Sequence, residues 1–121
     1  MPLAGYVLDT SALIASFYDR PDLEDLIADA AAGRVRLYLA TVALADAETE
    51  LRAGTNGWAH LLYEEHIVSV PLSETCALEV GSWRGALAVR HTAHEARALR
   101  AAVVTQEPKL YDGLGVAIRP I

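Results

Sequence analysis

Three carboxylates stand close to the positions where buried strands are expected to end. Asp9 directly follows an apolar run, Asp46 lies in the first turns of a helix after a second strand, and Glu107 follows a later strand. The carboxyl ends of parallel strands share one sheet edge, so the three acids are expected to meet there. Clustered carboxylates repel one another unless a cation offsets them, and Mg²⁺ takes carboxylate and water ligands. The three acids therefore predict a Mg²⁺ or Mn²⁺ site suited to phosphodiester hydrolysis.

Asp9 permits two interpretations. Leu3–Leu8 is short and largely apolar, which predicts a strand buried on both faces, and either Thr10 or Ser11 is expected to cap the helix that follows. Asp9 is then held at the edge where ligands bind in open α/β sheets. Alternatively, Asp9 itself only caps the helix. These residues alone favour neither interpretation over the other.

The apolar periodicity predicts the elements that position these acids. Strands are expected over Leu3–Leu8, Arg34–Ala40, Ile67–Val70, Ala102–Thr105 and Val116–Ile118. Two helices are expected in each of the first three connections and a short loop in the last. The helices are expected to include Leu13–Phe17, Leu23–Ala31, Val42–Ala53, Trp58–Glu65, Ser73–Trp83 and Ala88–Arg100, with Thr41 as a cap and Gly54 and Asn56-Gly57 as a stop. Helical crossovers between short strands require a mainly parallel sheet, which predicts a three-layer α/β/α sandwich.

Length and composition limit the number of domains and the classes of structure and partner that the chain can have. The 121 residues fit one domain over 1–121, and no apolar run approaches the length of about 18 residues that a membrane span requires. The single cysteine, Cys76, cannot form an internal disulfide. We therefore expect a soluble, cytoplasmic protein. The net charge of −6 argues against broad electrostatic capture of nucleic acid, although a local basic patch remains compatible with it.

Three stretches, VLDTSALIA, ATVALADAETEL and VVTQEPKLYDGLGVAI, together resemble a PIN domain. PIN domains include the toxin nucleases of VapBC-type toxin and antitoxin pairs and several RNA-processing nucleases. The resemblance spans nearly the whole chain. It implies an α/β/α sandwich and metal-dependent cleavage of single-stranded RNA at a cluster of three or four acids.

The resemblance assigns roles to individual residues. Asp9 matches the first acid of the family, and Asp46 matches the second, which is a glutamate in most relatives. Glu107 replaces the aspartate of a Thr-x-Asp motif that begins here at Thr105. On this hypothesis Asp9, Asp46 and Glu107 are the catalytic and metal-binding acids, and Thr105 with Ser11 orients them.

One acid of the family pattern is missing. The family has an aspartate about sixteen residues before the threonine, where this chain has Val89, and no acid occurs between Glu79 and Glu95. With at most three carboxylates the site is expected to bind Mg²⁺ weakly. Two functions therefore stay open: a Mg²⁺- or Mn²⁺-dependent ribonuclease, and a PIN-like protein that has lost catalysis and acts by binding protein or RNA. An antitoxin is a candidate partner.

Other motifs carry weaker signals. HTAHE, from His91 to Glu95, matches neither zinc hydrolase pattern, and helical geometry predicts that His91, His94 and Glu95 project away from the sheet onto a solvated face. Glu50 shares a helix face with Asp46, although a surface charge is the favoured interpretation.

Two surface features complete the sequence-based expectations. Arg84, Arg90, Arg97 and Arg100 form either a phosphate-binding strip or ordinary surface charge. The helix expected over Ser73–Trp83 has apolar residues on more than one side, which predicts a homodimer or a standing protein partner.

Overall fold

The structure, a computed structural model, describes residues 3–63 and 66–121. Within these residues the chain forms a five-stranded sheet in the order β3-β2-β1-β4-β5, and every neighbouring pair is parallel. The strands are β1 (Ala4–Leu8), β2 (Val35–Ala40), β3 (Ile67–Val70), β4 (Ala102–Thr105) and β5 (Ala117–Pro120). The predicted parallel sheet is confirmed, with β1 at its centre.

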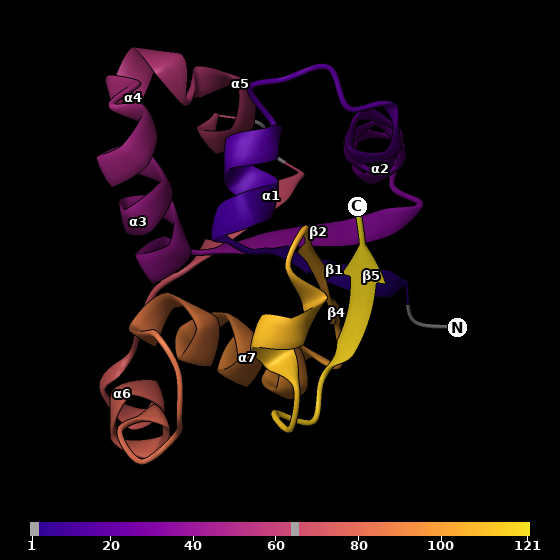
Figure 1. Cartoon of the computed structure of the whole chain (residues 1–121). Coiled ribbons are helices and arrows are strands. Elements are labelled where there is room, and N and C mark those ends of the chain that lie inside the picture. The colour runs from indigo at the N-terminus through magenta and orange to yellow at the C-terminus, as the bar shows by residue number, and fades with distance from the viewer. Residues whose placement is uncertain (1–2, 64–65) are drawn as a thin grey trace.

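Helices cover both faces of this sheet (Figure 1). In that view α1 and α2 lie above the sheet, and α7, with α6 against it, lies below. The predicted three-layer α/β/α sandwich is therefore confirmed. The bounds are α1 (Thr10–Ala15), α2 (Pro21–Ala31), α3 (Thr41–Leu51), α4 (Gly54–Gly57), α5 (Ala59–Leu62), α6 (Glu74–Val80), α7 (Leu87–Leu99) and the 3₁₀ turn η1 (Pro108–Tyr111). No helix in the described ranges is long and apolar enough to cross a membrane.

Two apolar clusters, one on each face of the sheet, hold the layers together. Val7 and Leu8 of β1 are both fully buried, but they belong to different clusters because successive strand residues point to opposite faces. Leu8 packs with α1, α2 and α3, whereas Val7 packs with Ala93 and Ala96 of α7. Burial on both faces fixes the register of β1, and therefore fixes the height at which Asp9 leaves the sheet.

The connection from β2 to β3 differs from the prediction. Ala40 is the N-cap residue of α3, and no side chain caps this helix, so the expected cap at Thr41 is wrong. Gly54 and Asn56-Gly57 do not simply stop a helix: Gly54–Gly57 forms the short helix α4 after Arg52 has turned the chain with a φ of 52°. Glu65, the predicted end of the next helix, lies outside the described residues, and α5 ends at Leu62.

The helix predicted over Ser73–Trp83 is shorter than expected. Ser73 caps α6 by accepting a hydrogen bond from the Cys76 N–H at 3.1 Å, as predicted, but α6 ends at Val80. Trp83 lies beyond it, half-buried, with the Arg97 guanidinium 5.2 Å above its ring. Val80 and Cys76 are buried by the protein itself. The prediction of a dimer rests on the apolar residues of this helix, and among them Leu78 is exposed.

Glu48 provides a pH-dependent link between α3 and α4. Its carboxylate accepts hydrogen bonds from the backbone N–H groups of Ala53 and Gly54 at 2.7 and 2.9 Å, and from the Trp58 indole N–H at 3.2 Å. The indole hydrogen bond is the largest cause of a Glu48 pKa below its ordinary value of 4.5. A lowered folded-state pKa means that ionised Glu48 stabilises the fold above about pH 4.5, and that this contribution is lost as the pH falls through the folded pKa.

We therefore expect Glu48→Gln to lower the urea midpoint at pH 7 and to have less effect in acid, where the parent also carries a neutral side chain. Denaturation curves in EDTA at both pH values measure this difference. Asp46→Asn is the control, since Asp46 lies on the same helix, is exposed and accepts no hydrogen bond from the described residues. An equal loss from Glu48→Gln at both pH values contradicts the argument.

Candidate functional site

Asp9 occupies the carboxyl end of the central strand. Its backbone N–H donates to the Val104 carbonyl of β4 at 3.2 Å, which continues the sheet by one residue. Its carboxylate Oδ1 accepts the Ala12 N–H at 2.9 Å, so Asp9 is the N-cap of α1. The predicted cap at Thr10 or Ser11 is therefore wrong. The two interpretations of Asp9 are compatible, because the cap uses one carboxylate oxygen and leaves the other for a second contact.

Ser11 links Asp9 to the end of β4. Its hydroxyl donates to Asp9 Oδ1 at 2.7 Å and accepts the Gln106 N–H at 2.8 Å. The Thr105 hydroxyl lies 3.3 Å from Ser11 and accepts the Glu107 N–H at 2.9 Å. Ser11 thus contacts the carboxylate that it was expected to orient, whereas Thr105 contacts the backbone of Glu107 and not its carboxylate. These bonds fix the ends of β1 and β4 relative to each other.

Tyr111 supplies a contact that the sequence did not predict. Its hydroxyl, at the end of η1, donates to Asp9 Oδ2 at 2.9 Å, and both residues are buried. Burial, together with the Asp9 carboxylate, raises the pKa of Tyr111 far above that of an ordinary phenol. The hydroxyl therefore keeps its proton and acts as a donor.

A cavity of about 260 Å³ opens beside this carboxylate. It is lined by Asp9, Thr10, Ser11, Ile14, Glu50, Val89, Gln106, Glu107, Leu110 and Tyr111. The structure thus brings together two of the three predicted acids, Asp9 and Glu107, and adds Glu50 from α3. Asp46 lies one turn before Glu50, is exposed, and is not among the lining residues. Val89, in the first turn of α7, lines the cavity at the place where the sequence pattern lacks an acid.

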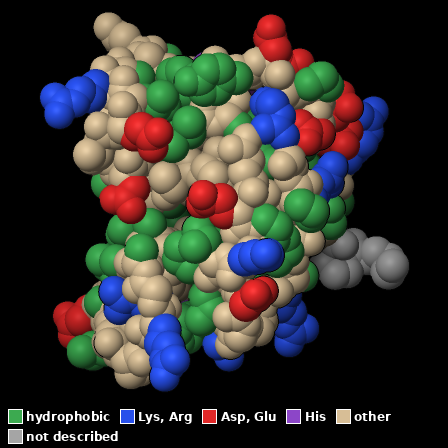
Figure 2. All heavy atoms as spheres, viewed as in Figure 1, with side chains coloured by type: hydrophobic (Ala, Val, Ile, Leu, Met, Phe, Trp, Pro, Cys, Tyr) green, Lys and Arg blue, Asp and Glu red, His purple; other side chains and the backbone are tan. Residues whose placement is uncertain are grey.

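The face drawn in Figure 2 carries acidic side chains in several places, among them over α2 and α3, and basic and apolar side chains lie between them. This interspersed pattern agrees with the net charge of −6 and differs from the continuous basic face that tracks a nucleic-acid backbone. Any contact with nucleic acid at the cavity must therefore depend on local groups there.

The donor set of the cavity can be tested against a divalent cation. A carboxylate offers about four lone pairs, and Asp9 uses two on Oδ1 and one on Oδ2, so Oδ2 keeps one acceptor position. Glu50 and Glu107 provide two further carboxylates in the same lining. Mg²⁺ requires one or two carboxylates plus waters, and this set meets that minimum. Three hydrogen bonds already offset part of the Asp9 charge, so the set fits a weakly held ion.

The sequence alone did not place Glu50 or Tyr111 in the cavity. The spacing of four residues placed Glu50 on the same helix face as Asp46, but the pattern could not tell which of the two lies over the cavity. Tyr111 lies 102 residues from Asp9, and its only signal is that it follows the end of β4 closely. Elements that leave the carboxyl edge of a sheet are the ones able to contribute to a site there.

The HTAHE segment is not on a solvated face, so that prediction is wrong. His91 is fully buried, and His94 and Glu95 are partly buried, because α6 packs on the side of α7 that faces away from the sheet. The arginine strip is not available as a strip either. Arg90 donates to the Val80 carbonyl at 3.0 Å, which ties α7 to the end of α6, and Arg97 stacks over Trp83.

Comparison with known proteins supports the fold. A chain from the crystal structure of VapBC2 from Rickettsia felis, bound to a DNA fragment from their promoter, matches with a TM-score of 0.68. The match covers 96% of this chain and 98% of that chain. The fold is PIN-like. The sequences are 14% identical, so this likeness concerns the fold alone. No family model and no curated protein sequence matches the chain.

Proposed function

We propose that the protein is a VapC-like PIN nuclease that cleaves single-stranded RNA with Mg²⁺ or Mn²⁺. The observation that carries the proposal is the cavity at the carboxyl edge of the sheet, where buried Asp9 keeps a free acceptor position on Oδ2 beside Glu50 and Glu107. Bound there, the ion supplies an activated water and offsets the charge that builds on the phosphate.

The residues of the chain supply the carboxylate ligands for the ion and the hydrogen bonds that orient them. Asp9 Oδ2 and Glu107 are the proposed ligands, and Glu50 or Asp46 supplies the α3 carboxylate that the family places on this helix. The geometry favours Glu50, since it lines the cavity and Asp46 does not. Ser11 and the Ala12 N–H hold Asp9 in one orientation, so that little reorganisation is needed when an ion binds.

Two other observations favour the second function, a PIN-like protein that has lost catalysis and acts by binding a partner. Val89 places an apolar side chain where the family has an acid, and the Tyr111 hydroxyl stabilises the Asp9 charge without a metal. Both features suit a site that holds no ion, as expected of a protein that has lost catalysis and acts by binding a partner. On either function we propose an antitoxin-like protein as the partner, the cytoplasm as the compartment and a homodimer as an assembly. The exposed Leu78 of α6 and Leu110 of η1 are apolar positions available for such contacts.

Cleavage assays separate the two functions. We expect the purified chain to cut single-stranded RNA in Mn²⁺ and not in EDTA. Asp9→Asn should lower the rate by more than about 100-fold, because even an outer partner of a metal ligand is worth about 10- to 100-fold. Asp112→Asn is the matched control, since Asp112 is exposed, follows η1 and does not line the cavity.

Comparison of Glu50→Gln with Asp46→Asn then identifies the α3 carboxylate, and the larger loss is expected for Glu50→Gln. If the folded protein leaves RNA intact in Mn²⁺, or if Asp9→Asn cuts as fast as the parent, the nuclease proposal is wrong. In the first of these cases the binding function stands.

A further inference from the structure

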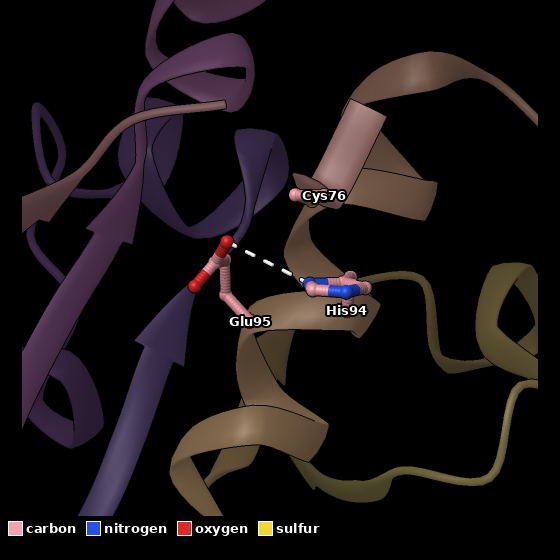
Figure 3. Close-up of side chains that lie close together, drawn as sticks. All are labelled: Cys76, His94 and Glu95. Atoms are coloured by element: carbon pink, nitrogen blue, oxygen red, sulfur yellow. Dashed lines mark ion pairs between the residues drawn. The ribbon is translucent and has the colours of Figure 1, made fainter. Parts of the chain in front are cut away.

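The contact between α6 and α7 holds a second cluster of ligand-type side chains, Cys76, His94 and Glu95. One ligand atom from each lies within 4.8 Å of the other two. Figure 3 shows His94 and Glu95 side by side on α7, with Cys76 reaching them from α6. Cys76 is 1% exposed, and the side chains of His94 and Glu95 are 17% and 15% exposed. None of the three lines the cavity beside Asp9, so the cluster is separate from that site.

His94 is oriented as a metal-binding histidine would be. Its Nε2 lies 2.5 Å from Glu79 Oε2, and a carboxylate oxygen accepts, so Nε2 carries a proton that it donates to Glu79. Its Nδ1 is buried, has no hydrogen-bond partner among the described residues, and lies 3.7 Å from Glu95 Oε1. Histidines that bind metals usually donate their other N–H to a carboxylate in this way. The free lone pair of His94 therefore points into the cluster.

His91 is the observation that calls for a ligand. It is fully buried, and neither of its ring nitrogens forms a hydrogen bond of good geometry with the described residues, although the ring lies near the Pro71 carbonyl. Nearly all buried polar side chains have a hydrogen-bond partner. His91 Nε2 lies 3.7 Å from Glu95 Oε1, close enough to form a hydrogen bond after a small movement of Glu95. A group that draws Glu95 into one position would satisfy His91 as well.

We propose that Cys76 Sγ, His94 Nδ1 and Glu95 Oε1 bind one Zn²⁺ ion, with a water as the fourth ligand. Sulfur, imidazole nitrogen and carboxylate oxygen together are a ligand set for zinc and unsuited to Mg²⁺, which prefers oxygen. Zinc bonds of about 2.0 to 2.3 Å place tetrahedral ligand atoms about 3.5 Å apart, so the ligand atoms approach one another by at most about 1.3 Å on binding. The pair His94 Nδ1 and Glu95 Oε1, which is 3.7 Å apart, hardly moves. The Cys76 thiol releases its proton to solvent in this step.

Glu79 and His91 act as outer partners in this site, Glu79 on His94 and His91 on Glu95. The ion joins α6 to α7, and α7 carries Val89 to the cavity. The site is therefore a structural clamp that fixes one wall of the cavity. It accounts for the histidines of HTAHE, which the PIN resemblance leaves without a role.

The test uses the full chain, stripped with a chelator and kept reduced, and titrated with Zn²⁺. We expect one Zn²⁺ per chain and a higher melting temperature, with both lost in Cys76→Ser and His94→Gln. Glu79→Gln, a change on an exposed side chain, should weaken Zn²⁺ binding by about 10- to 100-fold without unfolding the protein. His60→Gln is the matched control and should bind like the parent, since His60 bonds Gly57 and Ser16, outside the cluster.

If the Cys76 or His94 variants fail to fold, the absorption spectrum of Co²⁺ bound to the parent chain still tests the proposal. Co²⁺ bound to the parent chain should show a thiolate charge-transfer band and the strong visible absorption of tetrahedral cobalt, and an excess of Mg²⁺ should not remove them. Absence of the thiolate band overturns the proposal. Zinc binding that survives Cys76→Ser but is lost in Asp9→Asn also overturns it, since the ion then belongs to the cavity.

Discussion

Tyr111→Phe is expected to lower the free energy of unfolding of the metal-free protein by about 1.5 to 3 kcal/mol, the usual contribution of a hydrogen bond to a charged group. The phenol O–H is a donor to buried Asp9 Oδ2, and its loss leaves a charged oxygen without that partner. The same change should tighten Mn²⁺ binding by up to about tenfold, because a hydrogen bond worth about 1.4 kcal/mol no longer offsets part of the Asp9 charge. The variant is thus less stable in EDTA and regains part of the loss in Mn²⁺.

Tyr38→Phe provides the control for this experiment. Tyr38 is half-buried against the same apolar cluster as Tyr111, and its hydroxyl has no hydrogen bond within the described ranges. Removal of that hydroxyl should change neither stability nor Mn²⁺ affinity appreciably. Urea denaturation in EDTA and calorimetric Mn²⁺ titration of both variants give the two quantities. If Tyr111→Phe loses the same stability in both buffers and binds Mn²⁺ no better than the parent, the ion does not use Asp9.

The sequence predicted the edge of the sheet better than the contacts made there. Leu3–Leu8 is too short for a helix and apolar on both faces, and these local properties were enough to place Asp9 at a strand end. The cap was expected at Thr10 or Ser11 or, alternatively, at Asp9, where the structure has it, because Asp, Ser and Thr are all good N-caps and composition cannot tell at which of three consecutive candidates the helix begins. The start is settled by the register of β1 against β4, which is a long-range property.

Helix α7 shows a second limit. Its apolar residues Val89, Ala93 and Ala96 pack in the same cluster as Val7 of β1. Helical geometry gives the direction in which His91 points, but not which element of the chain covers that direction. Here α6 returns to pack on the outer side of α7, so polar residues that read as a solvated face are buried. For the same reason the sequence could not tell whether Asp46 or Glu50 lines the cavity. That depends on how α3 is rotated against its neighbours.

These two limits share a physical cause. Period and capping signals come from residues a few positions apart, whereas a site at a sheet edge is assembled from segments that leave different strands. Asp9 and Ser11 lie in one segment, and their contact was predicted. Tyr111 and Glu50 reach the cavity from η1 and α3, and only the packing of those elements shows it. The residues that decide whether the site binds metal are therefore the ones that local patterns describe least well.

Mn²⁺ should reverse the sign of the effect that Val89→Asp has on stability. Val89 lines the cavity with Asp9 and Glu107 and is 8% exposed, so an aspartate there loses apolar burial and meets two like charges. We expect the metal-free variant to be less stable by about 1 to 3 kcal/mol. Part of that loss is offset, because an acid in the first turn of α7 suits the helix dipole by about 0.3 to 1 kcal/mol and that turn holds no acid now.

A fourth carboxylate should in turn raise the affinity for Mn²⁺. Saturation at about 100 times the dissociation constant stabilises a protein by about 2.7 kcal/mol, which exceeds the loss once the helix dipole has offset part of it, and the parent, which binds the ion weakly, gains less. Thermal melts of parent and variant should therefore cross, with the variant lower in EDTA and higher in millimolar Mn²⁺. Val116→Asp is the control: Val116 packs in the same apolar cluster away from the cavity, so its loss should be equal in both buffers. If Val89→Asp behaves like Val116→Asp, Val89 is a core residue and does not stand at a vacant metal-ligand position.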